Sequence, residues 1–416
     1  MPGAARGSVH VLGAGIVGIC TALSLLEKGS DVELIDRNDP ASGASHGNAG
    51  VISPWSCVPQ SMPGLWKQVP GWLIDREGPL SVRLSHAPRM LPWLLRFLRA
   101  GGADRLPAIA DAMNALNRPN VELYRQHLKG TGQEGLLRDA AYVHVFRNPA
   151  NADLDALGWR MRLDRGVPLE RIDGNTLREI EPEIAPDYRA AIVIRDQARA
   201  TDPGALGRAL MDKALRMGAR FRRAEIRGLQ RDGSEWRIDT TGDTITSTCT
   251  VVAMGAWSAR LLAPLGLTLP LEAERGYHLM FANPGIAVNN SVMDVEGKFV
   301  ASSMRDGLRC AGTAEFAGLD APPDYRRAEV FRRMAKRLFP RLDTETVTPW
   351  MGVRPSFPDS LPVIGAVPGA AGLFVAVGHC HYGLGMAPNT GRILAGLIAG
   401  EPLNLDLAPY AIGRFA

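Results

Sequence analysis

Residues 9–37 carry the pattern that most restricts the fold of this chain. The short apolar run at 9–12 ends in the stretch GAGIVG at 13–18, after which apolar residues recur at helical spacing. A second apolar run at 31–35 ends at Asp36, where the acid that binds ribose in such units is expected. This order of strand, turn, helix and strand predicts a βαβ unit that binds a dinucleotide.

The residues of the glycine-rich stretch have separate physical roles. Gly13 permits the tight turn, Gly15 lets the backbone approach a pyrophosphate, and Gly18 lets the helix pack closely on the strand. The helix N-terminus, with Ile16 and Val17 in its first turn, is then expected to face the phosphates.

Two features after the second strand bear on the identity of the dinucleotide. Asp36 would accept hydrogen bonds from ribose hydroxyls and repel a 2′-phosphate, which disfavours NADP and leaves FAD and NAD open. A run of small residues at 41–50 follows, where an extended cofactor would thread between backbone segments. The alternative for this run is an ordinary polar loop.

Size and composition favour a two-domain protein that binds a small ligand. A chain of 416 residues exceeds one hydrophobic core, so two domains are expected. The formal charge of +4 is spread along the chain, which argues against a nucleic-acid footprint and favours a small ligand. No apolar run is long enough to cross a bilayer, so a soluble protein is expected.

The cysteines indicate neither a disulfide framework nor a metal site. They are odd in number, widely scattered and without a CxxC pair, which predicts a protein of the cytoplasm with no metal. Residues 66–99 add four large aromatic side chains and an amphipathic stretch at 90–98, with Arg96 within it and Arg99 directly after it. This stretch predicts a core-packing helix, with peripheral contact at the inner face of the cell membrane or contact with a partner as the alternatives.

Periodicity places further elements along the chain. Helices are expected at 104–130, 152–166 and 203–217, the last capped by Thr201 or Asp202. Strands are expected at 141–146, 190–195, 274–281 and 308–313, with antiparallel hairpins over 220–250. The run from Thr250 is expected to return to the nucleotide-binding sheet.

Six motifs in order resemble one family of flavoproteins. They are the opening GAGIVG, SHGNAGVISP at 45–54, TVVAMGAWS at 250–258, ERGYHL at 274–279, WMGVRPSFPDSLPVIG at 350–365 and GHCHYGLGMAPNTGRILAGLI at 378–398. The ordered set resembles the FAD-dependent D-amino acid oxidase superfamily, and most of all its bacterial D-amino acid dehydrogenase branch. The resemblance covers nearly the whole chain and implies FAD as the cofactor.

The resemblance also implies the architecture. The expected fold is α/β, with a doubly wound, Rossmann-like FAD-binding domain and an interleaved α+β substrate domain that contains a mixed or antiparallel sheet. The FAD-binding domain would comprise residues 1–85, 195–268 and 345–416, and the substrate-binding domain residues 86–194 and 269–344. The small-residue loop would pass beside the isoalloxazine ring. A helix from about Ala387 to Ala399 would direct its N-terminus at the flavin.

Cofactor-binding residues follow from the βαβ unit and from motif positions. The expected set is Gly13, Gly15, Ile16, Val17, Gly18, Asp36, Arg37, Ser45, His46, Asn48, Ala49, Gly255, Trp257, Gly378, Gly383, Leu384, Gly385 and Met386.

Five residues are expected at the substrate. Arg354 occupies the position at which similar enzymes bind the substrate carboxylate, and Arg275 corresponds to a second site arginine. Tyr277 lies two residues further along a strand and therefore on the same face as Arg275. His381 and Tyr382 add bulk near the flavin where related dehydrogenases have smaller residues, which predicts a shaped pocket.

The implied reaction is oxidation of a D-amino acid by hydride transfer from Cα to flavin N5. The imino acid would hydrolyse to a 2-oxo acid and ammonia, and the electrons would pass to a quinone or another acceptor. Secondary amino acids such as hydroxyproline, proline or sarcosine are the nearest alternative substrates. A non-catalytic flavin-binding subunit and an NAD-dependent dehydrogenase are the alternatives from other classes. The sequence leaves oxygen as acceptor and the oligomeric state open.

Overall fold

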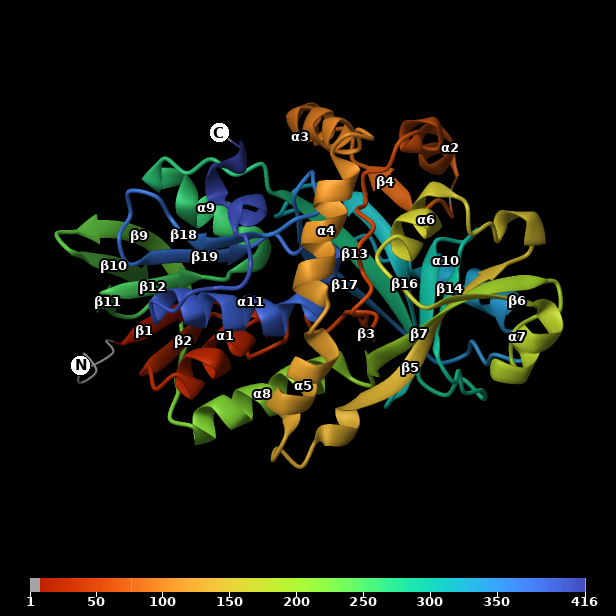
Figure 1. Cartoon of the computed structure of the whole chain (residues 1–416), viewed down its shortest axis with the longest axis horizontal. Helices are drawn as coiled ribbons and strands as arrows, with labels where there is room; N and C mark the ends of the chain where they lie inside the picture. Colours follow the sequence, from red (N-terminus) through yellow and green to blue (C-terminus); the bar gives the residue numbers. More distant parts are fainter. Residues whose placement is uncertain (1–7, 76, 416) are drawn as a thin grey trace.

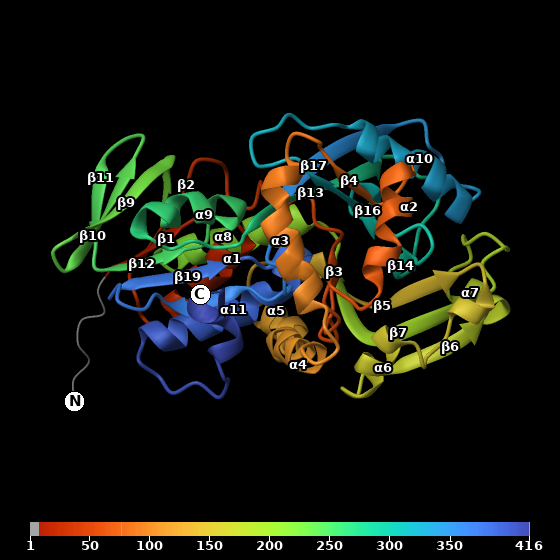
Figure 2. The same ribbon diagram turned by 90° about the horizontal axis from the view of Figure 1, so that it is seen from above.

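Two β-sheets, each with its own helices, form the molecule. The structure is a computed structural model that describes residues 8–75 and 77–415. A six-stranded sheet holds the first strand of the chain, and a ten-stranded sheet lies beside it. The two sheets occupy opposite halves of the long axis, and helices α3 and α4 lie over the region between them (Figure 1, Figure 2).

The six-stranded sheet is the predicted nucleotide-binding sheet. Its order is β18-β19-β12-β1-β2-β8, and only β18 runs antiparallel to its neighbour. The predicted return of the chain at Thr250 is confirmed, because β12 pairs with β1 in parallel. The strands are β1 (Val9–Leu12), β2 (Val32–Asp36), β8 (Arg220–Arg223), β12 (Cys249–Val252), β18 (Val363–Ala366) and β19 (Leu373–Val377).

Both faces of this sheet are covered, as the near-continuous burial of its strands requires. Helices pack on one face: α1 (Ile16–Glu27), α4 (Leu106–Asn117), α5 (Asn120–Leu128), α8 (Pro203–Arg216) and α11 (Gly383–Ile398). A three-stranded antiparallel sheet and a short helix cover the other: β9 (Ile226–Asp232), β10 (Glu235–Thr240), β11 (Thr244–Ser247) and α9 (Ser258–Leu262).

The ten-stranded sheet is mixed and mostly antiparallel, as predicted for the substrate domain. Its main path is β17 (Val347–Ser356), β13 (Glu272–Phe281), β16 (Gly307–Phe316), β15 (Phe299–Met304), β14 (Ser291–Asp294), β5 (Leu137–Phe146), β7 (Ala190–Ala200) and β3 (Val51–Ile52). Strand β4 (Leu80–Val82) pairs with β16, and β6 (Leu169–Asp173) pairs with β7. Helix α10 (Arg326–Leu338) packs its apolar side chains on this sheet, and α2 (Val69–Ile74), α3 (Ala87–Ala100), α6 (Leu157–Leu163) and α7 (Gly174–Ile180) complete the helices.

Several predicted elements differ from the observed ones for identifiable reasons. The helix expected over 104–130 is two helices, because Pro119 separates α4 from α5. The hairpins expected over 220–250 are confirmed for β9 to β11, whereas β8 joins the nucleotide-binding sheet instead. The last helix begins at Gly383, one turn before the predicted start. Asp202 is the N-cap of α8, since its carboxylate accepts a hydrogen bond from Ala205 N at 2.9 Å.

The predicted domain boundaries stay predictions. Most strands of each sheet fall within the segments assigned to that domain. Three strands in the segments assigned to FAD binding, β3, β4 and β17, instead pair within the ten-stranded sheet. The chain therefore passes between the two sheets several times, and this places segments distant in sequence around one cavity.

Candidate functional site

One cavity of about 1790 Å³ lies where the two sheets meet. The glycine-rich turn, the loop after β2 and the segment 253–257 line it from the nucleotide-binding half. Strands β13 and β17 line it from the other half, and residues 378–385 close it between them. This volume exceeds the range usual for a drug-sized ligand and accommodates a large cofactor together with a substrate.

The glycine-rich turn is pressed against the neighbouring strand. Gly13 has φ +109°, and a Cβ there would lie 2.5 Å from the carbonyl oxygen of Ala253. A Cβ on Gly18 would lie 1.9 Å from the carbonyl oxygen of Gly13, so the helix approaches the turn as closely as predicted. Gly15 has only the hydroxyl of Ser45 within 4 Å of its Cβ position and lies open to the cavity.

Asp36 and Ser45 fix the backbone around this turn. The Asp36 carboxylate accepts hydrogen bonds from Ala14 N at 2.8 Å and from Asn38 N at 2.9 Å. The Ser45 hydroxyl accepts from Ile16 N at 3.0 Å and so ties the small-residue loop to the first turn of α1. The N-cap residue of α1 is Gly15, which has no side chain, so Ser45 supplies the side-chain acceptor at this helix end and the end lies at the cavity.

Arg309 binds the backbone of the small-residue loop. Its guanidinium donates to the carbonyl oxygens of His46 at 2.9 Å and Asn48 at 2.6 Å. Burial lowers the pKa of Arg309 to about 10. Sequence reasoning did not single out this residue, because an arginine in the middle of β16 has no motif to distinguish it.

The predicted cofactor residues divide into those that line the cavity and those that do not. Gly18, His46 and Met386 do not line it, because Gly18 packs on Gly13, the His46 ring lies against Gly204, and Met386 is fully buried in the core. The Arg37 guanidinium stacks over the ring of Trp257 at 4.5 Å. The lining residues are Gly13, Gly15, Ile16, Val17, Asp36, Arg37, Ser45, Asn48, Ala49, Gly255, Trp257, Gly378, Gly383, Leu384 and Gly385.

Arg354 lies in the cavity beside a buried acid. Its Nη1 donates to Glu274 Oε1 at 2.6 Å, while its Nε and Nη2 make no hydrogen bond within the described chain. A Cβ on Gly276 would lie 2.3 Å from the guanidinium carbon, so glycine at this position lets Arg354 lie flat across β13. One edge of the guanidinium is therefore held by protein and the other is left for a ligand.

Glu274 is a second residue that sequence reasoning missed. It is 3% exposed, and its second oxygen accepts hydrogen bonds from Ser356 Oγ at 2.7 Å and from Gln60 Nε2 at 3.2 Å. Burial opposes its charge, but the charge of Arg354 and the hydrogen bonds from Arg354 and Ser356 hold its pKa below the usual range. Glu274 opens the ERGYHL motif, so its place beside the expected arginine strand was the available signal.

His381 and Tyr382 form the end of the cavity next to α11. Burial lowers the pKa of His381 to about 4, which leaves its imidazole neutral at pH 7. The Tyr382 hydroxyl donates to the carbonyl oxygen of Val58 at 2.8 Å, and its ring centroid lies 3.9 Å from that of His381. Cys380 is a buried thiol whose pKa burial raises to about 12.

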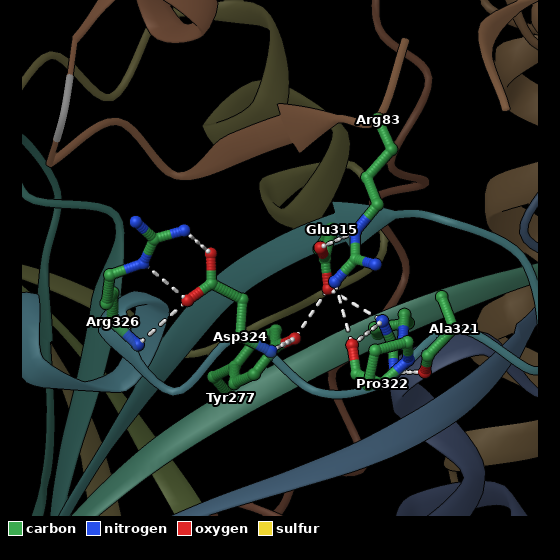
Figure 3. Close-up of polar contacts among 8 residues, drawn as sticks. Arg83, Tyr277, Glu315, Ala321, Pro322, Asp324 and Arg326 are labelled. Atoms are coloured by element: carbon green, nitrogen blue, oxygen red, sulfur yellow. Dashed lines mark hydrogen bonds and ion pairs between the residues drawn. The ribbon is translucent and has the colours of Figure 1, made fainter. Parts of the chain in front are cut away.

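Arg275 points away from the cavity into a buried ion pair. Its Nη1 donates to Glu315 Oε2 at 3.0 Å, and its guanidinium also binds the carbonyl oxygens of Ala321 and Pro322. Figure 3 shows this cluster, in which Arg83 donates to the same carboxylate of Glu315 at 2.8 Å. Arg275 is 1% exposed and does not line the cavity, so its guanidinium is not available to a substrate carboxylate.

Tyr277 shares the face of Arg275, as its spacing predicts. Its hydroxyl donates to Glu315 at 2.5 Å and accepts from Asp324 N at 3.0 Å (Figure 3). Burial, together with the hydrogen bond to Glu315, raises the pKa of Tyr277 to about 12. The ring lines the cavity, but the hydroxyl is committed to this cluster.

The fold and the cavity together define a class of protein. A dinucleotide-binding α/β domain that shares one large cavity with a second, mixed sheet is the architecture of a two-domain flavin oxidoreductase. A family model described as FAD dependent oxidoreductase matches residues 8–397. The chain belongs to this family of FAD-dependent oxidoreductases, and its cofactor is FAD.

Relatives agree with this assignment over the whole chain. A D-amino-acid oxidase of Bradyrhizobium diazoefficiens is 39% identical over 416 residues, which cover 98% of each chain. A D-amino acid dehydrogenase of Rhizobium rhizogenes is 30% identical, covering 98% of this chain and 99% of that one. The solved glycine oxidase of Geobacillus kaustophilus, at 24% identity, has the same fold, with a TM-score of 0.73 and 98% of each chain covered.

The buried histidine His379 predicts a pH dependence of stability. Its pKa is lowered to about 3 by burial, and its Nε2 lies 3.0 Å from Thr390 Oγ1. As pH falls, the unfolded chain takes up this proton near pH 6.5 but the folded chain does not, so the free energy of unfolding decreases below pH 6.5. Between pH 8 and pH 5 this one group costs about 2 kcal/mol.

Urea unfolding of the wild type and of a His379→Gln variant at pH 8 and pH 5 measures the contribution of His379 to the free energy of unfolding. The variant should lose about 2 kcal/mol less stability than the wild type over the same interval. Equal losses in the two proteins would contradict the low pKa of His379.

Proposed function

We propose that this protein is an FAD-dependent D-amino acid dehydrogenase. The observation that carries the proposal is Arg354, whose guanidinium lies in the cavity with one edge bound to Glu274 and the other edge free. A free guanidinium edge in a partly enclosed site suits the α-carboxylate of an amino acid. The full-length relatives named D-amino-acid oxidase and D-amino acid dehydrogenase support this choice of substrate.

The fit of the cavity to FAD supports the same proposal. In this account the N-terminus of α1 binds the pyrophosphate, because Gly13 and Gly15 leave no side chain in the way. The Asp36 carboxylate binds the ribose of the adenosine half. The N-terminus of α11, at Gly383 to Gly385, faces the flavin ring and favours its reduced, more negative form.

The residues around Arg354 bind and orient the substrate in this account. Glu274 keeps the Arg354 guanidinium flat across Gly276, so the guanidinium binds the substrate carboxylate in a fixed orientation. His381, which is neutral at pH 7, and the Trp350 ring, which stacks on His278 at 5.0 Å, provide walls without adding charge. Bound FAD supplies the acceptor for the hydride that leaves Cα, and water then hydrolyses the imino acid to a 2-oxo acid and ammonia.

Substitution of Arg354 tests this proposal. Arg354→Ala and Arg354→Lys should bind FAD but lower kcat/KM for D-amino acids by about 100-fold or more and about 10-fold respectively, because charge-assisted hydrogen bonds to the carboxylate are lost or weakened. The visible absorbance of the purified variants reports bound FAD, and the loss of this absorbance when D-amino acids reduce the flavin anaerobically reports the kinetics of each variant. Arg326→Lys, at a side chain that is 90% exposed, is the matched control. Unchanged kinetics in both Arg354 variants would overturn the assignment.

We further propose that the electrons pass to a quinone at a membrane surface. None of the helices in the described ranges 8–75 and 77–415 is long and apolar enough to cross a bilayer. Large apolar side chains are nevertheless exposed on the segment 66–98, namely Trp66, Leu73, Ile74, Leu84, Leu91, Leu95 and Leu98. Leu73, Leu84 and Leu91 also line the cavity, so this apolar surface is continuous with the proposed flavin site.

The charge of α3 fits an anionic bilayer. This helix carries exposed Arg89, Arg96 and Arg99 and no acidic residue, and it exposes Leu91, Leu95 and Leu98 beside them. Apolar side chains flanked by arginines are the pattern of a helix that lies in the interface of a membrane. Helices α2 and α3 lie along the same edge of the molecule, the upper one in Figure 1.

Vesicle binding tests the membrane proposal. Wild-type protein should sediment with vesicles that contain phosphatidylglycerol, and 0.5 M salt should weaken this binding. The double variant Leu95→Ser/Leu98→Ser should bind at least about 10-fold more weakly, because two apolar side chains no longer enter the bilayer. The matched control is Leu215→Ser, which alters an exposed leucine on α8. Wild-type protein that stays in the supernatant would refute membrane binding.

A further inference from the structure

The part of the cavity next to β5 and α6 is lined by aromatic side chains and one cation. Tyr142 and His144 enter it from β5, Trp159 and Arg162 from α6, and Tyr382 from the segment before α11. These five residues are called the Arg162 subsite below. No acid among the described residues lines this part of the cavity beside Arg162.

Arg162 is a cation without a counter-ion in the described chain. It forms no ion pair there, and its only protein hydrogen bond is from Nη1 to the carbonyl oxygen of Gly158 at 3.0 Å. Its guanidinium stacks over the Trp159 ring at 4.7 Å, which fixes its position but supplies no negative charge. Burial lowers the pKa of Arg162, and an arginine stays protonated even so.

The neighbours of Arg162 add hydrogen-bonding capacity but no charge. His144 is buried, its Nδ1 has no partner within the described chain, and burial lowers its pKa to about 3. Its ring lies 4.3 Å from Tyr142 and 4.9 Å from Trp159. The Tyr142 hydroxyl makes no hydrogen bond within the described residues. Arg162 is partly buried, and a cation without a counter-ion among such groups is left poorly solvated unless an anion from outside binds it.

The Arg162 subsite and Arg354 lie at two ends of one chain of contacts. Arg354 binds Glu274, both are close enough to His381 to affect its pKa, and His381 contacts Tyr382, which lies beside Arg162. Glu274 balances the charge of Arg354. Arg162 has no such acid, so the cavity has one cation in excess at the end away from Glu274.

We propose that the Arg162 subsite binds the side-chain carboxylate of the substrate, so that the preferred substrates are acidic D-amino acids such as D-glutamate and D-aspartate. This inference rests on the proposed D-amino acid oxidation, in which Arg354 holds the α-carboxylate. Arg162 then neutralises the second carboxylate, with Tyr142 as a further donor. A neutral side chain of the same shape leaves Arg162 without an anion and binds more weakly.

Kinetics with matched substrates test the proposal. Wild-type enzyme should have a higher kcat/KM for D-glutamate than for D-glutamine, which has the same shape without the charge. Arg162→Met should lower kcat/KM for D-glutamate by about 10- to 100-fold and leave D-glutamine within a factor of about three. Arg162→Lys should recover part of the loss. Arg160→Met, at an exposed arginine of the same helix, is the matched control.

Two kinetic outcomes would overturn the proposal. An equal loss for D-glutamate and D-glutamine would mean that Arg162 binds the α-carboxylate instead. Unchanged kinetics in Arg162→Met would mean that Arg162 serves only to stabilise α6 through Gly158 and Trp159.

Ligand binding without turnover separates this proposal from the proposed function. Glutarate should perturb the flavin absorbance of the resting holoenzyme at a concentration at least about 10-fold lower than butyrate does, and Arg162→Met should abolish the difference. Equal affinities in the wild type would refute the subsite whatever the enzyme oxidises. An Arg162-dependent preference for glutarate, with no D-amino acid reducing the flavin, would retain the subsite and refute the proposed function.

Discussion

The buried carboxylate of Glu274 is the constraint on which the site depends. It is almost inaccessible to water, and Arg354, Ser356 and Gln60 bind its two oxygens. Breaking such a pair would leave a buried charge uncompensated, at a cost of about 3–5 kcal/mol. The orientation of Arg354 is therefore set by the protein before a substrate arrives, and Gly276 provides the space in which it lies. Hydride transfer from a substrate to a flavin requires this kind of preorganisation, because the two must be held in a fixed orientation.

The sequence predicts the nucleotide-binding half of the molecule well, because local rules decide it. Gly13 needs a positive φ, Gly18 has no room for a side chain, and Asp36 ends a strand that must lie beside the first. The motif that contains Arg354 was sufficient to predict it as a site residue, and Arg354 does line the cavity.

The other half depends on contacts between residues distant in sequence. Arg275 and Arg354 both lie in motifs, but only the pairing of β13 with its neighbours decides that one binds Glu315 and the other Glu274. Arg162 and Arg309 belong to no motif. They differ from other arginines only because the fold places Arg162 beside His144 and Arg309 beside the small-residue loop. Alternation along a strand did predict that Tyr277 would share the face of Arg275.

The account makes one central claim, that a D-amino acid passes its electrons to the flavin in this cavity. Anaerobic mixing of the purified holoenzyme with D-, L- and N-substituted amino acids, followed by the visible flavin absorbance, tests it directly. The account predicts bleaching by D-amino acids and none by their L-enantiomers. Bleaching only by cyclic or N-methyl amino acids would contradict the claim in favour of secondary amines, and no bleaching by any of them would leave a flavin-binding protein without this activity.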